Sequence, residues 1–133
     1  MYVLETSVLA RLHHPGVRAA VDALPPDELA RCALTDLEIG HSSRNGAEWD
    51  LTATMLGAFT EIPLTAETVD RARCVQRLLA AAGLGGRKVP DLLIAAAAEH
   101  AGATLVHYDR DFELIAGITS QPHQWVVPRG TID

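Results

Sequence analysis

The sequence has few of the residues that disulfide-rich, metal-stabilised or membrane proteins need. Aromatic residues make up 5% of its 133 residues, and it contains only two cysteines, Cys32 and Cys74. These lie far apart without metal-ligand spacing, so we expect reduced, partly buried thiols instead of a disulfide or a zinc site. The longest wholly apolar run, 92–98, has seven residues, whereas a membrane-spanning helix needs roughly 20. We therefore expect no transmembrane helix.

Positive charge is also scarce. Eleven basic residues stand against 17 acidic ones, which gives a formal charge of −6, and Lys88 is the only lysine. A protein that holds nucleic acid on a general basic surface needs clustered lysine and arginine, so that class is excluded. Cleavage of nucleic acid at one place is not excluded. No basic segment precedes the apolar residues 2–4, so we expect no secretory signal and a cytoplasmic location.

What is present is the composition of an ordinary globular protein, 48% apolar and 21% charged. The length suits one domain, which we expect to span residues 1–133. Apolar periodicity and turn residues predict strands that alternate with helices. In chain order they are a strand 2–4, a helix capped by Thr6, a helix 17–24, a strand 29–33, a helix opened by a Thr35–Glu38 capping box, a helix 47–59, an extended segment 61–64, a helix capped by Thr65, a helix 90–101 closed by Gly102, a strand 104–108, a helix 112–118 and an edge strand 124–127. This alternation is typical of an α/β fold, with a parallel sheet covered by helices on both faces.

Acidic residues recur where this pattern places the carboxyl ends of strands. Glu5 follows the first strand, Glu38 the second and Asp109 the fourth, with Asp111 close behind, while Asp91 opens a helix after a basic loop. Ligands of open parallel sheets bind at this edge. Carboxylates held together repel one another, and a divalent cation removes that conflict. Oxygen ligands without nearby cysteine or paired histidine favour Mg²⁺ or Mn²⁺, which can activate water for in-line attack on a phosphodiester.

Each acid also has a purely structural explanation. Glu38 completes a capping box, Asp91 complements the dipole of its helix, and Asp109 and Asp111 suit a turn. Glu5 is the hardest to explain in this way, because a charge next to a buried strand must be solvated, paired or bound to metal.

Histidine and the basic loop have alternatives of the same kind. His107 lies in an apolar strand and is better explained as a core histidine with a hydrogen-bonding partner than as a ligand. Arg87 and Lys88 suit a solvated loop, although a basic pair just before Asp91 can also contact a substrate phosphate, and Arg110 is a third candidate for that contact.

Four segments, in order, resemble the acidic motifs of the PIN domain. They are VLETSVL at 3–9, TDLEI at 35–39, VPDLLIAA at 89–96 and HYDRDF at 107–112. More narrowly, the chain resembles the VapC-type toxins of bacterial toxin–antitoxin pairs. The resemblance implies a three-layer α/β/α fold with a central, mainly parallel sheet and an Mg²⁺- or Mn²⁺-dependent endoribonuclease that cuts structured RNA such as tRNA. It also implies a homodimer inhibited by a cognate antitoxin, whose C-terminal segment wraps the toxin and reaches the acidic groove.

Carried over position by position, the resemblance assigns the metal site to Glu5, Glu38, Asp91 and Asp109, with Asp111 as a second-line acid. Glu38, Asp91 and Asp109 are then the catalytic residues, and Thr6 or Ser7 supplies a supporting hydroxyl.

Glu5 departs from the family pattern, which ordinarily has aspartate at the end of the first strand. Its carboxylate is one methylene farther from the backbone. Mg²⁺ demands near-ideal octahedral geometry, and catalytic groups tolerate displacements of only about 0.5 Å. We therefore expect this chain to bind a divalent cation but to cleave RNA more slowly than a Glu5→Asp variant.

Two other functions stay open at this point. The first is a PIN-like binding module whose altered site no longer cleaves and which acts through its antitoxin or an RNA. The second is a phosphoryl-accepting receiver domain, which is similar in size and in its early acidic residue. Receivers carry a lysine after a late strand, whereas Lys88 lies in a loop ahead of a helix, so this alternative is disfavoured.

Overall fold

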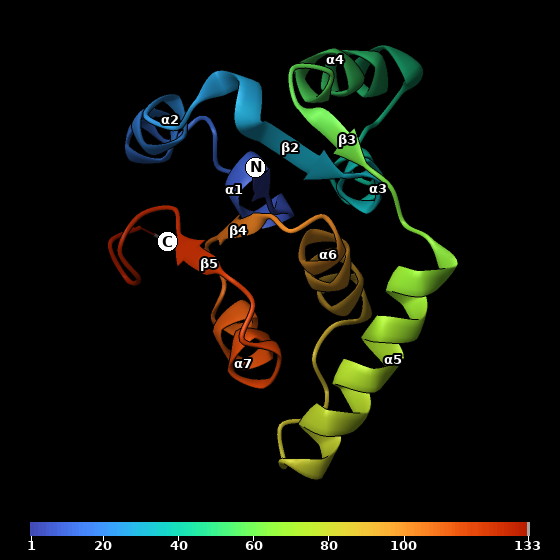
Figure 1. The fold of residues 1–133 in the computed structure, drawn as a ribbon. Coiled ribbons are helices and arrows are strands. Elements are labelled where there is room, and N and C mark those ends of the chain that lie inside the picture. Colours follow the sequence, from blue (N-terminus) through green and yellow to red (C-terminus); the bar gives the residue numbers. More distant parts are fainter. Residues whose placement is uncertain (133) are drawn as a thin grey trace.

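The computed structural model describes residues 1–132 as one central sheet with helices on both faces (Figure 1). The five strands are β1 (Tyr2–Leu4), β2 (Leu29–Cys32), β3 (Thr60–Ile62), β4 (Thr104–His107) and β5 (His123–Trp125). Their order in the sheet is β3-β2-β1-β4-β5, and every neighbouring pair is parallel. The expected α/β fold with a central parallel sheet is confirmed.

Seven α-helices within residues 1–132 connect and cover the strands. They are α1 (Thr6–Leu9), α2 (Pro15–Asp22), α3 (Ala33–Gly40), α4 (Gly46–Leu56), α5 (Ala66–Ala81), α6 (Val89–His100) and α7 (Arg110–Thr119), with a 3-10 turn, η1 (Pro26–Glu28), before β2. Figure 1 shows α5, α6 and α7 on one side of the sheet and α2 and α4 on the other. The described chain thus has the three layers expected of an α/β/α fold. No helix in it is long and apolar enough to cross a membrane.

Adjacent residues of the central strands pack into different cores. Val3 and Leu105 belong to the core formed with α5, α6 and α7, whereas Leu4 and Val106 belong to the core formed with α1, α2 and the end of α4. All four side chains are at most 1% exposed. This follows from the two-residue period of a strand, whose side chains point alternately to opposite faces. The central strands are therefore apolar on both faces, as in other covered parallel sheets.

Two of the predicted helix caps are not formed. Glu5, not Thr6, caps α1, because its carboxylate accepts a hydrogen bond from Ser7 N at 2.7 Å. Helix α3 begins at Ala33, so Thr35 lies inside it, fully buried, with its hydroxyl 3.0 Å from that of Thr6. The predicted Thr35–Glu38 capping box is wrong, because Thr35 binds a residue 29 positions earlier in the chain.

Other local predictions are confirmed. Thr65 caps α5 and shares a reciprocal capping box with Thr68. Gly102, after α6, has a φ of 66°, the left-handed conformation that glycine adopts without strain. Of the two cysteines, Cys32 is buried, but Cys74 is exposed. The expectation of two partly buried thiols therefore does not hold for Cys74, which lies on the outer side of α5.

Candidate metal centre

The sheet topology brings the expected acidic residues to one place. β1 is the central strand, with β2 on one side and β4 on the other, so the winding reverses between β1 and β4. Glu5 directly follows β1, and Asp109 follows β4 by two residues. Asp91 in the first turn of α6 and Glu38 on α3 complete the set, and all four line one cavity of about 300 Å³. This is the edge at which ligands of open α/β sheets bind.

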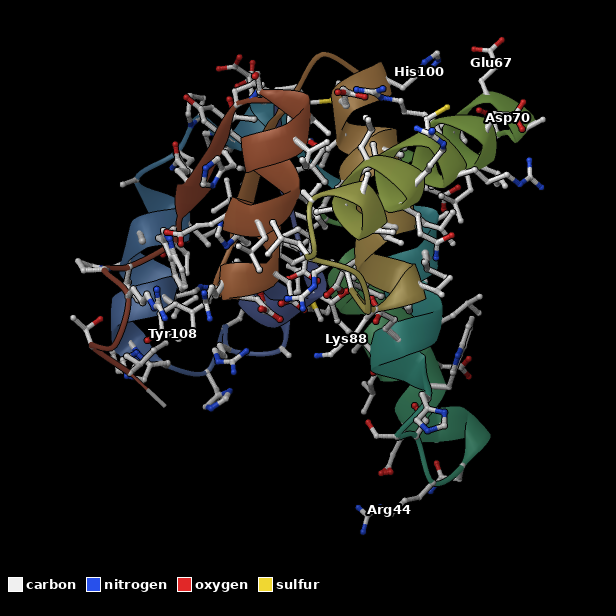
Figure 2. The ribbon with its side chains drawn as sticks, turned by 90° about the horizontal axis from the view of Figure 1, so that it is seen from below. Arg44, Glu67, Asp70, Lys88, His100 and Tyr108 are labelled. Atoms are coloured by element: carbon white, nitrogen blue, oxygen red, sulfur yellow. The ribbon has the colours of Figure 1, made fainter. Side chains whose placement is uncertain are left out.

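Lys88 and Tyr108 mark this end of the molecule in Figure 2. Glu67, Asp70 and His100 lie at the opposite end, and Arg44 is at the tip of the projecting α3–α4 hairpin. The cavity therefore opens on the side where the strands end and helix α6 begins.

Asp91 is buried without its full set of partners. The residue is 4% exposed, and its Oδ2 has no hydrogen-bond partner. Burial, and secondarily the charge of Asp109, raises the pKa of Asp91 from 3.8 to about 7. A buried carboxylate oxygen that no protein group satisfies is costly, and a divalent cation would supply the missing partner. The hard oxygen donors of this site fit Mg²⁺ or Mn²⁺.

Asp109 is held by its own helix. Its Oδ1 accepts from Asp111 N at 2.9 Å, which caps α7, and its Oδ2 lies 4.0 Å from Nζ of Lys88. Carboxylate oxygens of Asp91, Asp109 and Asp111 lie within 4.8 Å of one another. Asp111, however, receives a hydrogen bond from Arg87 Nη1 at 2.6 Å. Asp111 is thus hydrogen-bonded to a cation, whereas the cation nearest Asp109, Lys88, is only within ion-pair distance at 4.0 Å.

The Glu5 carboxylate is hydrogen-bonded to the first turn of α1. The residue is 3% exposed, and its Oε2 accepts from the backbone N–H and the hydroxyl of Ser7. The same hydroxyl oxygen accepts from Tyr108 N at 2.8 Å, which ties Glu5 to the end of β4. Burial raises the pKa of Glu5 to about 7, although the Ser7 hydrogen bonds oppose this, and the charges of Asp91 and Glu38 add to the increase.

Glu38 is anchored through a pair of threonines. Thr6 Oγ1 donates to Glu38 Oε1 at 2.6 Å and lies 3.0 Å from Thr35 Oγ1. Because the Thr6 hydroxyl has one proton and gives it to Glu38, Thr35 is the donor in the second bond. Both candidate hydroxyls, those of Thr6 and Ser7, therefore contact acidic side chains of the cavity.

The three basic candidates are placed differently. Lys88 is exposed and lines the cavity, whereas Arg87 is committed to Asp111. Arg110 is exposed at the first residue of α7 and does not line the cavity.

The sequence prediction missed two polar residues that line the cavity, Arg11 and Tyr108. The Arg11 guanidinium lies over the Tyr108 ring, 5.4 Å from its centre, and its Nη1 donates to Ser7 O at 2.8 Å. Tyr108 carried a signal, because it directly precedes Asp109. For Arg11 we find none, because its approach to Tyr108 is a tertiary contact.

His107 is a buried histidine with a partner, as predicted. It is 0% exposed, and its Nε2 lies 2.9 Å from Nδ1 of His123 on the neighbouring strand β5. Burial, reinforced by His123, lowers the pKa of His107 to about 4, so the ring is neutral at pH 7.

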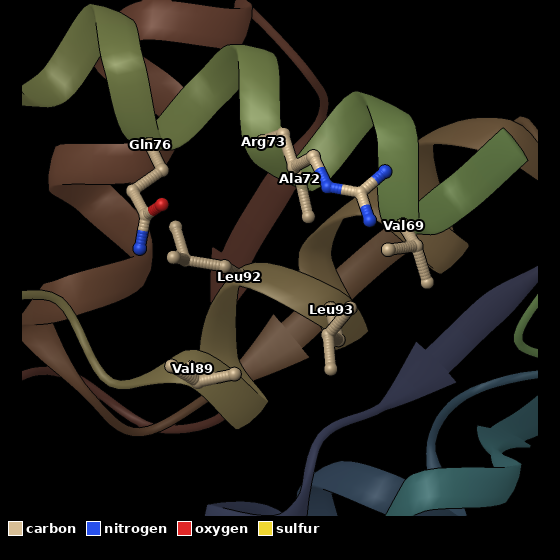
Figure 3. A pocket seen from close by; sticks show the side chains of 7 residues that line it. All are labelled: Val69, Ala72, Arg73, Gln76, Val89, Leu92 and Leu93. Carbon is tan, nitrogen blue, oxygen red and sulfur yellow. The ribbon is translucent and has the colours of Figure 1, made fainter. Parts of the chain in front are cut away.

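A second hollow, of about 120 Å³, lies between α5 and α6 (Figure 3). Its lining is aliphatic apart from Arg73 and Gln76, and it contains no acidic side chain. The groups needed to bind a divalent cation are therefore in the acidic cavity and not in this hollow.

Comparison with known proteins now identifies the family. The PIN domain family model matches residues 2–118, and the chain belongs to the PIN domain family. This membership removes the receiver-domain alternative. Within the family the chain belongs with the VapC proteins. It is 53% identical over 133 residues to "Ribonuclease VapC51" of Mycobacterium tuberculosis (strain H37Rv), in an alignment that covers 99% of this chain and 97% of the relative. It is also 41% identical to "Ribonuclease VapC18" of the same strain, over 99% of both chains.

Solved structures show the same fold at low sequence identity. A chain of VapBC2 from Rickettsia felis, crystallised with a DNA fragment from its promoter, superposes with a TM-score of 0.78 at 19% identity and covers 93% of this chain and 97% of its own. A chain of VapBC-1 from nontypeable Haemophilus influenzae gives a TM-score of 0.77 at 19% identity, over 94% and 97% of the two chains. These likenesses confirm the three-layer fold.

Proposed function

We propose that this protein is an Mg²⁺- or Mn²⁺-dependent endoribonuclease toxin that hydrolyses phosphodiester bonds of structured RNA, tRNA in particular. The observation that carries the proposal is the unpartnered, buried Oδ2 of Asp91 at a cavity lined by three further carboxylates. The relatives are named as ribonucleases, and these names support the same activity.

Asp91 and Asp109 would hold the cation, with Glu5 and Glu38 completing the acidic wall. When bound, the cation activates a water and offsets negative charge on the phosphate under attack. Asp111 contributes less than the family resemblance implies, because Arg87 occupies one of its oxygens.

In this proposal Glu38 accepts a proton from the attacking water. Its Oε1 accepts a hydrogen bond from the Thr6 hydroxyl at 2.6 Å, which fixes the carboxylate at the cavity wall for this general-base role. In this proposal Lys88, which is exposed at the cavity wall, contacts a phosphate of the bound strand. Arg87 is unsuited to that contact while it is paired with Asp111.

The activity is tested by incubating a panel of tRNAs with and without Mn²⁺. Cleavage is expected only with the cation, and Asp91→Asn is expected to abolish it. Asp70→Asn is a matched control, because it removes the same charge from the opposite end of the molecule, where Asp70 is exposed and paired with Arg73. Cleavage that persists in Asp91→Asn, or that needs no cation, contradicts the proposal.

A catalytically weak PIN-like module that binds RNA or an antitoxin is the second candidate. The observation that favours it is that the Glu5 carboxylate already accepts hydrogen bonds from both the backbone N–H and the hydroxyl of Ser7. Glu5→Asp shortens the side chain by one methylene and is expected to raise the cleavage rate about tenfold or more, since misplacement by about 1 Å can cost a hundredfold. Equal rates for the two proteins would show that Glu5 does not attenuate the site.

A cognate antitoxin is the partner that we propose. The R. felis and H. influenzae neighbours are VapBC assemblies, and a cavity with four carboxylates attracts a cationic side chain of a partner. Copurification with a small cognate protein tests this. The homodimer and the cytoplasmic location stay predictions, and light scattering of the purified protein tests the first of them.

A further inference from the structure

His107 and His123 form a hydrogen-bonded pair directly behind the acidic cavity. His107 Nε2 lies 2.9 Å from His123 Nδ1, and His107 Nδ1 accepts from the backbone N–H of Asp109 at 3.2 Å. A series of hydrogen bonds therefore runs from β5, through the end of β4, to Asp109, the N-cap residue of α7.

These contacts determine where the ring protons are. Asp109 N–H points at Nδ1 of His107, so this nitrogen has no proton, and the single proton of the neutral ring is on Nε2. That proton is donated to Nδ1 of His123, which is the acceptor, so the proton of His123 is on its own Nε2. Only this combination of tautomers satisfies both bonds.

The ring of His107 is also held on its sides. Its centre lies 5.3 Å from that of Phe112 and 5.0 Å from that of Trp125. The His123 ring meets it edge to edge through the hydrogen bond, with the ring centres 5.2 Å apart and the ring planes 19° apart. Trp125 is itself fixed by a hydrogen bond from Nε1 to Glu113 at 2.7 Å. A fully buried ring packed in this way has little freedom to turn away from Asp109.

Asp109 receives its orientation from two directions. Its backbone N–H is bound by His107, and its Oδ1 is bound by Asp111 N. With those two points fixed, Oδ2 is the oxygen left to face Lys88 across the cavity. The bond from Nδ1 of His107 to the N–H two residues later has the geometry of an Asx turn, with the imidazole in place of an amide oxygen.

We propose that His107 and His123 are positioning residues of the acidic site: His123 holds the His107 ring, and His107 holds the backbone of Asp109 so that Oδ2 is presented to a divalent cation. The last step rests on the proposed function, whereas the tautomers and the Asp109 contact do not. Removing a side chain that orients a metal ligand typically costs about tenfold to a hundredfold in metal affinity.

The test compares two substitutions of His107. In His107→Asn the side-chain oxygen replaces Nδ1 as the acceptor for the N–H of Asp109, whereas His107→Leu has no acceptor. Both variants lose the bond to His123. Mn²⁺ affinity, measured by titration calorimetry, is expected to fall about tenfold or more in His107→Leu and to be largely retained in His107→Asn. Ile115→Val, a buried change in α7, controls for lost stability and should leave the affinity unchanged.

Nuclear magnetic resonance supplies a readout that does not need the metal. In the metal-free protein, the ¹⁵N shifts should show His107 protonated on Nε2 alone, and the Asp109 amide should exchange slowly in wild type and His107→Asn but faster in His107→Leu. Similar Mn²⁺ affinities for the Asn and Leu variants, or a proton on Nδ1 of His107, overturn the proposal. A wild-type protein that binds no Mn²⁺ contradicts the proposed function, and the amide-exchange comparison still decides whether His107 positions Asp109.

Discussion

Replacement of Asp91 by asparagine should stabilise the metal-free protein, and the gain should depend on pH. Burial raises the pKa of Asp91 from 3.8 to about 7 in the folded state. The folded protein therefore binds this proton more tightly than the unfolded chain does, so stability from Asp91 is complete below the unfolded pKa and is lost as pH rises through about 7. Asparagine has nearly the same shape and does not ionise, so the variant escapes this loss.

The pKa values set the size of the effect. The increase in the pKa of Asp91 from 3.8 to about 7 corresponds to about 4 kcal/mol of unfavourable free energy once Asp91 is ionised in the folded protein. The asparagine amide is buried where Oδ2 has no partner, which costs about 1–3 kcal/mol. The net gain of Asp91→Asn is thus about 1–3 kcal/mol near pH 8, and near pH 4 it vanishes or changes sign.

Urea unfolding in the presence of a chelator, at both pH values, measures this difference. Glu5 also loses stability with rising pH in both proteins, because burial raises its pKa in the same direction. The charge of Asp91 adds to that increase, so the difference between the two proteins contains the effect of Asp91 on Glu5 as well as the ionisation of Asp91 itself. Excess Mn²⁺ should reverse the order, since a ligand at about 1,000 times its dissociation constant adds about 4.1 kcal/mol to a protein that binds it. An Asp91→Asn variant less stable than wild type near pH 8, or a difference independent of pH, would refute the reasoning.

Two further variants test the surroundings of the site. Arg87→Ala removes the partner of Asp111, which adds an uncompensated charge beside the cavity, so calorimetry should show tighter Mn²⁺ binding; weaker binding would mean that Arg87 holds the site together. Tyr108→Phe deletes a hydroxyl that donates to Ile132 O and accepts from two backbone N–H groups of the C-terminal segment. It should cost about 1–2 kcal/mol in urea unfolding, and a loss of Mn²⁺ affinity instead would place the role of this hydroxyl at the metal.

The sheet and the grouping of the acids were predictable because they depend on short-range patterns. The central strands carry apolar side chains on both faces, such as Val3 on one face and Leu4 on the other. This pattern is typical of a parallel sheet covered on both sides. Once the strands are parallel, residues that follow them meet at one edge, and this places Glu5 beside Asp109 without knowledge of any side-chain contact.

The polar contacts within the site were not predictable, because they join residues distant in sequence. Thr35 has the local signature of a helix cap, but its hydroxyl bonds to Thr6, 29 residues away. Arg87 was expected in a solvated loop and pairs with Asp111, 24 residues later. A local preference for a cap contributes about 1 kcal/mol, and a buried hydroxyl left without a partner costs at least as much. The tertiary contact therefore decides the outcome.

The formal charge of −6 overstates the charge of the metal-free protein at pH 7. Glu5 and Asp91 have pKa values of about 7, so each is protonated in part of the molecules at that pH. A divalent cation needs its ligands ionised, and its binding must release these protons. Calorimetric titration with Mn²⁺ in buffers of different ionisation enthalpy should therefore show release of about one proton per cation near pH 7 and of almost none near pH 9. Release that is absent at both pH values would mean that the acids are already ionised, in which case burial does not hold them protonated and the stability gain expected for Asp91→Asn disappears with it.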